Sequence, residues 1–336
     1  MILILAKSDF NMKTPMVSIV MPLYNKENDV SRAVQSALNQ TLADSELIVV
    51  NDGSTDRGPE IVRNISDSRI RLINQENAGV SAARNRGIQE AKSDLIAFLD
   101  ADDEWKPDFL ETILSLQAAF PSCDVFATNY LYREVSGIYR APIIRGIPAS
   151  PWRGIISDYF HTASRSDPPL WSSAIAVTKD AIESVGLFPV GVTDGEDLLT
   201  WARLALRYDI AYSTEPKAVF WFGPPQFGPV RRAPDEKDVV GDVLKALLPN
   251  VPPDQVVAFK RYIALWHRMR ASNFLNLGAR SEALQEIRNI SRFSKRNPQL
   301  YIYFAIAISP KPIFGFLVKG FNIAKSLRRK LTSNRK

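Results

Sequence analysis

Three acidic residues, Asp100, Asp102 and Asp103, stand directly behind an apolar run at residues 95–99. Such a run predicts a buried strand, so the acids are expected on a turn at the rim of a sheet, with Asp100 and Asp102 on the same side. Carboxylates this close together repel one another, and a bound cation relieves the repulsion. Oxygen ligands suit hard divalent ions, so the cluster predicts a site for Mg²⁺ or Mn²⁺. The alternative, that Asp102 or Asp103 caps a helix predicted from Pro107, accounts for only one of the acids.

The elements that must position this cluster alternate between strand and helix patterns. Apolar runs at residues 17–23, 46–50, 70–73 and 95–99 predict buried strands, and a helical spacing of apolar residues follows each of them. Four such units predict an α/β fold with a mostly parallel central sheet and helices on both faces. Ligands bind beyond the carboxyl ends of the strands in such sheets. Those ends carry polar residues that are therefore expected to converge at one edge: Tyr24 and Asn25, Asn51 and Asp52, and Asp100 to Asp103.

The later part of the chain gives weaker signals. Residues 130–169 are rich in Arg, Pro and Gly without clear periodicity, which predicts a loop region over the site. Helical patterns alone fill residues 235–327, and the Gly and Pro residues at 223–229 favour a domain boundary near residue 230. We therefore expect three parts: an N-terminal extension at 1–15 that could be disordered, a main domain at 16–230, and a helical C-terminal region with a basic tail at 231–336.

Composition excludes several kinds of site. The single Cys123 has no partner for a disulfide or a thiolate metal site, and His161 and His267 are too far apart in sequence for a zinc motif. This composition suits a reducing, cytoplasmic setting and leaves carboxylates as the metal ligands. A dinucleotide-binding oxidoreductase is excluded as well, because no G-x-G-x-x-G motif follows the first strand.

The net charge of +6 is concentrated at the C-terminus, where residues 325–336 contain six cations and no acid. The last helical pattern, at residues 314–330, pairs apolar residues with cations. A basic amphipathic helix of this kind can lie in the headgroup layer of an anionic membrane, which would put the protein on the cytoplasmic face of the membrane as a peripheral protein. It could equally pack against the rest of the chain. No transmembrane span is predicted, and nucleic acid is not an expected partner because the basic tail lacks an aromatic-studded face.

Four segments, in order along the chain, resemble the family 2 glycosyltransferases of the GT-A fold. They are VSIVMPLYN (residues 17–25), ELIVVNDGSTD (46–56), NAGVSAARN (77–85) and FLDADD (98–103). The resemblance spans about residues 17–222 and is weaker at 130–170. It implies a catalytic domain at 16–230 and an inverting, metal-dependent transfer of a sugar from a nucleotide-diphospho-sugar, a UDP-sugar being favoured. A saccharide or lipid-linked saccharide is the implied acceptor, in bacterial-type cell-surface polysaccharide or glycolipid assembly.

The resemblance also implies roles for single residues in donor binding. Pro22 and Tyr24 would bind the nucleotide, and Asp52 would contact its base. Arg84 would lie near the base or the diphosphate. Asp100 would contact the ribose or the metal, and Asp102 would be the direct metal ligand of the D-x-D motif.

A second acidic pair, Glu196 and Asp197, precedes an amphipathic helical pattern at residues 198–206 and resembles the family's E-D motif. An inverting transfer needs a base that accepts the proton of the attacking hydroxyl, and a metal-bound carboxylate cannot serve. Asp197 is therefore the predicted base, and Glu196 is the second choice. The alternative is that both acids only stabilise the first turn of a helix through its dipole.

Two features depart from the family or remain open. The His that members of the family often carry after the strand near Val219 is missing. Either Arg231 or Arg232 helps the metal to hold the diphosphate, or the donor site is incomplete. Trp152, Trp171 and Trp201 could stack on sugar rings, and Trp171 is the best acceptor-site candidate.

A catalytically inactive sugar-nucleotide-binding or scaffold protein of the same fold is the alternative function, although the presence of both acidic pairs argues against it.

Overall fold

The structure, a computed structural model, describes residues 14–222, 234–294 and 298–333. Its strands are β1 (Val17–Leu23), β2 (Ser45–Asp52), β3 (Ile70–Gln75), β4 (Leu95–Phe98), β5 (Glu104–Trp105), β6 (Val125–Arg133), β7 (Tyr139–Arg140), β8 (Arg153–Ile155), β9 (Ile175–Thr178) and β10 (Ile210–Trp221). Its α-helices are α1 (Val30–Leu38), α2 (Gly58–Arg63), α3 (Val80–Glu90), α4 (Phe109–Ala119), α5 (Tyr159–Arg165), α6 (Lys179–Ser184), α7 (Glu196–Ala205), α8 (Val239–Leu247), α9 (Val256–Leu277), α10 (Arg280–Phe293), α11 (Pro298–Ile308) and α12 (Lys311–Ser333).

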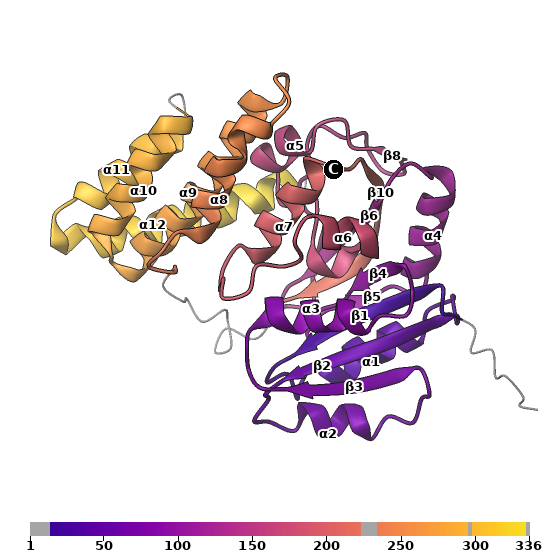
Figure 1. Cartoon of the computed structure of the whole chain (residues 1–336). Helices are drawn as coiled ribbons and strands as arrows, with labels where there is room; N and C mark the ends of the chain where they lie inside the picture. The colour runs from indigo at the N-terminus through magenta and orange to yellow at the C-terminus, as the bar shows by residue number, and fades with distance from the viewer. Residues whose placement is uncertain (1–13, 223–233, 295–297, 334–336) are drawn as a thin grey trace, which may run out of the picture.

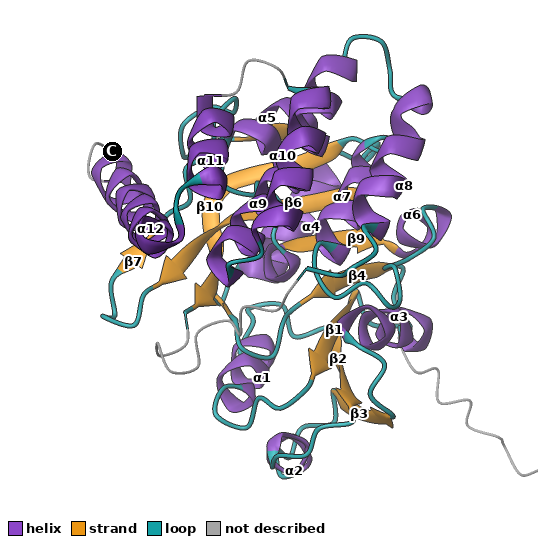
Figure 2. Ribbon diagram, turned by 90° about the vertical axis from the view of Figure 1, so that its left-hand side faces the viewer, coloured by secondary structure: helices purple, strands orange, loops and turns teal. Residues whose placement is uncertain are grey.

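One mixed sheet organises the N-terminal two thirds of the chain, with the strand order β3-β2-β1-β4-β9-β6-β10-β5 (Figures 1 and 2). Strands β3, β2, β1 and β4 are mutually parallel, as are β6 and β10. Strand β9 joins the two groups by pairing antiparallel with β4 and with β6. The predicted α/β fold is confirmed, and the sequence had not indicated this antiparallel junction.

The central strands are buried on both faces because alternate side chains enter different cores. In β1, Val20 contributes to one hydrophobic cluster and the adjacent Ile19 to the other, and β2 repeats the pattern with Ile48 and Leu47. Helix α3 packs closely on β1, since a methyl group added at Gly87 would lie 2.3 Å from Val20 Cγ1. This packing fixes the position of Arg84 one helical turn earlier.

The predicted loop region at residues 130–169 is only partly correct. Strand β6 continues to Arg133, strands β7 and β8 pair with β6 and β10, and α5 begins after Asp158. The Asp158 side chain accepts a hydrogen bond from the His161 backbone, as an N-cap does. These elements are two to seven residues long except for β6, so their periodicity is too short to be read from sequence.

The C-terminal helices α8 to α12 gather beside the sheet (Figure 1). Helix α8 and the first half of α9 share a hydrophobic core with the sheet, through residues such as Leu244, Phe259 and Tyr262. A separate cluster joins the second half of α9 to α10, α11 and α12. The proposed boundary near residue 230 lies outside the described residues and stays a proposal. No helix in the described ranges combines the length and apolar character that a bilayer crossing requires.

Candidate active site

The turn behind β4 separates the three clustered acids into different environments. Asp103 is 1% exposed, and its Oδ2 accepts hydrogen bonds from Ser173 Oγ at 2.5 Å and from Trp171 Nε1 at 3.1 Å. Burial, together with the negative charges of Asp102 and Asp100, raises its pKa well above the ordinary value. Asp103 therefore anchors the turn from inside. None of the three acids caps the following helix, whose N-cap is Asp108.

Asp100 and Asp102 lie at the rim, where their side chains are 25% and 32% exposed. Lys26, just beyond the end of β1, places its Nζ 2.5 Å from Asp102 Oδ2, and Arg32 donates to the Asp102 carbonyl oxygen at 2.6 Å. Burial would lower the pKa of Lys26, but the charge of Asp102 outweighs it, and the net pKa is raised. The partly exposed carboxylate oxygens of Asp100 and Asp102 are of the donor type that Mg²⁺ and Mn²⁺ prefer.

Arg84 joins this rim to the second acidic pair. Its Nη2 donates to Asp100 Oδ1 at 2.8 Å and its Nη1 to Glu196 Oε1 at 3.1 Å, across 112 residues of sequence. The side chain is 3% exposed, and the two carboxylates raise its pKa although burial opposes this. Asn85 holds the neighbouring Phe188 backbone with hydrogen bonds in both directions. The structure thereby brings the two predicted acidic motifs to one site.

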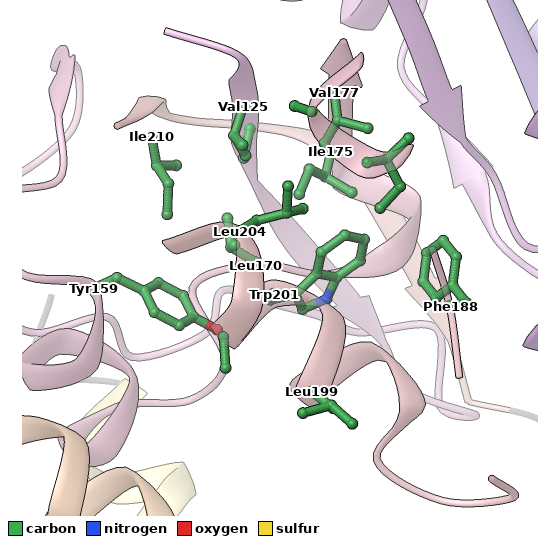
Figure 3. Packing of buried hydrophobic residues seen from close by; sticks show 14 of the residues in the cluster. Val125, Tyr159, Leu170, Ile175, Val177, Phe188, Leu199, Trp201, Leu204 and Ile210 are labelled. Carbon is green, nitrogen blue, oxygen red and sulfur yellow. The ribbon is translucent and has the colours of Figure 1, made fainter. Parts of the chain in front are cut away.

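Helix α7 begins at Glu196, so Glu196 and Asp197 occupy its first turn. Its N-cap, Gly195, has a φ of 82°, a backbone conformation that glycine adopts without strain. Figure 3 shows Leu199, Trp201 and Leu204 of the same helix among the buried hydrophobic residues, with Trp201 beside Phe188, and this packing fixes the helix against the sheet. Trp201 is therefore a core residue, 2% exposed, and is not available to stack on a sugar.

The environment of Asp197 makes it more basic than an ordinary carboxylate. Burial and the neighbouring negative charge of Glu196 raise its pKa to about 7, and the charge of Arg84 opposes the rise only in part. A base works best when its pKa is close to the working pH. The first turn of α7 thus holds a carboxylate suited to accept a proton near neutrality.

The predicted nucleotide-binding residues lie at the ends of β1 and β2. Tyr24 is 44% exposed, whereas Pro22 is partly buried within β1. Asp52 is 3% exposed, and its oxygens accept hydrogen bonds from Gln75 Nε2 and from the backbone amides of Ala78 and Gly79. Asp52 therefore fixes the loop that starts α3. Its predicted contact with a base stays a proposal.

The aromatic candidates differ in exposure and partners. Trp171 is partly buried, lies 4.7 Å from Phe220 between ring centroids, and donates to Asp103. It supports the acidic turn directly, whereas its predicted role at the acceptor stays a proposal. Arg231 and Arg232 lie outside the described residues.

Sequence reasoning missed several residues of the site. Lys26 follows Tyr24 and Asn25 at the end of β1, and that position was a usable signal. Tyr262 and Trp266 of α9 contact the chain on either side of Glu196 and Asp197. No local pattern could have identified them, because they are distant in sequence from the residues that they contact.

The sequence pattern of glycosyl transferase family 2 matches residues 18–185, which is half of the chain. The protein belongs to the family 2 glycosyltransferases. Among its relatives, glycosyltransferase GlyA of Streptococcus pneumoniae is 36% identical over 125 residues, covering 37% of this chain and 18% of GlyA. The hyaluronan synthase of Pasteurella multocida is 40% identical over 121 residues, covering 35% of this chain and 12% of that enzyme. The alignments thus span well under half of these relatives.

Two solved structures share the fold over almost the whole chain. S. aureus TarS in complex with UDP-GlcNAc has a TM-score of 0.64 at 16% identity, with 92% of each chain covered. The mannosyltransferase PcManGT from Pyrobaculum calidifontis, in complex with GDP-Man and Mn²⁺, has a TM-score of 0.56 at 17% identity, covering 96% of this chain and 84% of that one. This similarity establishes the GT-A-like architecture with C-terminal helices.

Proposed function

We propose that the protein is an inverting glycosyltransferase that moves a sugar from a UDP-sugar to an acceptor hydroxyl in the assembly of a cell-surface polysaccharide or glycolipid. The observation that carries the proposal is the Arg84 bridge between Asp100 and Glu196. It joins the rim that carries Asp100 to the first turn of α7, where Asp197, the residue after Glu196, is the proposed base. The donors bound by TarS and PcManGT and the product named for the hyaluronan synthase support the class of reaction.

On the donor side, Asp102 and Asp100 would hold Mg²⁺ or Mn²⁺, and Pro22, Tyr24 and Asp52 would bind the nucleotide. When bound, the ion neutralises negative charge that develops on the diphosphate leaving group. Lys26 adds a positive charge at the same rim, which favours the diphosphate electrostatically. Asp103 takes no direct part and keeps the turn in place through Ser173 and Trp171.

On the acceptor side, Asp197 would accept the proton of the attacking hydroxyl while its oxygen bonds to the anomeric carbon from the face opposite the diphosphate. Arg84 holds Glu196 through its carboxylate, so Glu196 is less free than Asp197 to take the proton. Its negative charge instead raises the basicity of Asp197. The two acids of the pair thus have different tasks.

Release of the nucleotide from a panel of UDP- and GDP-sugars tests the proposed function. We expect slow hydrolysis of one UDP-sugar in the presence of Mn²⁺ and loss of that release after chelation by EDTA. A protein that is stabilised thermally by a UDP-sugar but releases no UDP with any metal or saccharide acceptor would instead be a binding or scaffold protein.

We also propose that the last two helices contact an anionic membrane, where a lipid-linked acceptor would be found. No Asp or Glu follows Glu286, whereas twelve Lys and Arg residues do. Large apolar side chains on α11 and α12 are exposed, among them Tyr301 at 71% and Phe316 at 77%. Apolar groups beside cations, without acids, match the surface of an anionic bilayer.

Vesicle sedimentation tests the membrane contact. We expect the double variant Phe316→Ser, Lys319→Glu to bind vesicles that contain phosphatidylglycerol much more weakly than the wild type does. The control Val257→Ser changes another exposed apolar residue, on α9, and should bind like the wild type. Equal binding of all three proteins to the anionic vesicles would contradict the proposal. So would a wild type that binds neutral phosphatidylcholine vesicles as well as it binds the anionic ones.

A further inference from the structure

The segment that carries Glu196 and Asp197 is held from both sides by one face of α9. The Tyr262 hydroxyl donates to the carbonyl oxygen of Leu198, the residue after Asp197, at 2.9 Å. The Trp266 ring covers Gly195, the residue before Glu196, so closely that an added methyl group would lie 2.4 Å from Trp266 Cζ3. The two α9 residues are four positions apart and therefore project from the same side of the helix.

Arg270, a further four positions along α9, extends this face to the start of the same segment. Its Nη2 donates to the carbonyl oxygen of Asp235 at 3.1 Å. The Asp235 carboxylate accepts hydrogen bonds from the amide and the hydroxyl group of Thr193, at 3.1 and 2.5 Å. The segment is thus held at Thr193 and Gly195, before Glu196, and at Leu198, after Asp197.

A buried polar network fixes this face of α9 in turn. Trp266 Nε1 donates to Asp238 Oδ1 at 2.8 Å, Arg270 Nε donates to Glu286 Oε1 at 2.8 Å, and His267 Nδ1 lies 2.7 Å from Glu286 Oε2. His267, Arg270 and Glu286 are each at most 4% exposed. Asp238 Oδ2 and His267 Nε2 make no hydrogen bond, but the bonds that the cluster does make resist displacement, because breaking them would leave further buried polar atoms without a partner.

The same cluster has the composition of a possible metal site, since Asp238, His267 and Glu286 lie close enough to share an ion. Arg270 argues against that use. Its guanidinium is bonded to Glu286 and lies 3.9 Å from Asp238, so one positive charge already lies beside both carboxylates and disfavours a further cation there. The cluster is a structural support for α9.

We propose that Tyr262 and Trp266 are positioning residues that set the orientation of the catalytic base Asp197 without touching the substrate. The inference rests on the proposed function, because it takes Asp197 as the base. A displacement of about 1 Å at a reacting group can cost about 100-fold in rate, so a hydrogen bond and a ring contact on either side of the base are sufficient to influence catalysis. Helix α9 then supports catalysis by fixing the position of Asp197.

The variant Tyr262→Phe removes only a hydroxyl group, which donates to the Leu198 carbonyl oxygen and also lies 3.3 Å from the Tyr159 hydroxyl. We expect kcat to fall about 10- to 100-fold, with the affinity for UDP and Mn²⁺ little changed, because the donor side is untouched. The acid limb of the pH profile should also move to lower pH, since a looser segment admits water to Asp197. Trp266→Phe, which keeps a ring but loses the bond to Asp238, should act in the same direction.

The matched control is Tyr303→Phe, which deletes the hydroxyl group of a tyrosine that is 3% exposed in the separate cluster of the last helices. Its kcat and pH profile should match those of the wild type. Unchanged kcat and pH profile in Tyr262→Phe would overturn the proposal, as would a loss of UDP affinity equal to the loss of kcat. The proposed function would survive either result, because it fails only if the wild type transfers no sugar; transfer at the wild-type rate by Asp197→Asn would overturn only the assignment of the base.

Discussion

Replacing Asp197 with Asn is expected to slow single-turnover sugar transfer by about 1,000-fold, within the 10²- to 10⁴-fold range typical of a general base. The amide has nearly the same shape but cannot accept the proton of the acceptor hydroxyl. Binding of the nucleotide and Mn²⁺ should persist, because the donor side depends on other residues. Transfer at the wild-type rate would show that the base lies elsewhere.

The role of Asp197 also predicts how the transfer rate depends on pH. The carboxylate must be ionised to act, and its pKa is raised to about 7, so wild-type activity should fall about tenfold per pH unit below neutrality. Asp197→Asn should flatten this limb in the activity that remains. Asp194→Asn is the matched control, because Asp194 lies on the same segment and burial raises its pKa too. If Asp194→Asn abolished the limb and Asp197→Asn did not, the assignment of the base would be wrong.

Replacing Asp102 with Asn is expected to reduce transfer by about 10²- to 10³-fold, as the loss of a group that stabilises leaving-group charge does in other enzymes. The loss should be partly recovered at high Mn²⁺ concentration, because Asp100 remains. Activity measured against Mn²⁺ concentration checks this expectation.

The variant Lys26→Gln distinguishes two roles of Asp102: metal ligand and partner of Lys26 in an ion pair. It removes the cation that lies on Asp102 Oδ2 and keeps both carboxylates. We expect a tighter apparent Mn²⁺ affinity in this variant, the reverse of the effect of Asp102→Asn. Weaker Mn²⁺ binding in both variants would mean that the ion pair, and not a metal ligand, is what Asp102 supplies.

The sequence predicted the parallel half of the sheet well for a physical reason. Strands β1 and β2 are buried on both faces and leave continuous apolar runs, and the polar residues that follow them mark the functional edge. The junction through β9 was not predicted, because a strand of four residues does not reveal the direction of its neighbours. Helix α5 was missed for a similar reason, since seven residues give less than two helical turns in which to detect a period.

The candidate site shows where local patterns stop being informative. The acidic pairs could be placed from their positions after a strand and before a helix. The different environments of the acids behind β4 could not be predicted. Asp103 is buried and bonded to Ser173 and Trp171, whereas Asp102 lies at the rim. The Arg84 bridge and the support from Tyr262 depend on contacts 112 and 64 residues apart, which only the tertiary structure brings together.

The central claim is that the donor side, with Asp102, and the acceptor side, with Asp197, are separate. The most direct test measures Mn²⁺ binding in the presence of UDP by electron paramagnetic resonance, for the wild type, Asp102→Asn and Asp197→Asn. The wild type should bind Mn²⁺, Asp102→Asn should lose about 100-fold or more in affinity, and Asp197→Asn should bind like the wild type. If Asp197→Asn lost as much affinity as Asp102→Asn, or if the wild type bound no Mn²⁺ with UDP, the separation of a donor side from an acceptor side would be contradicted.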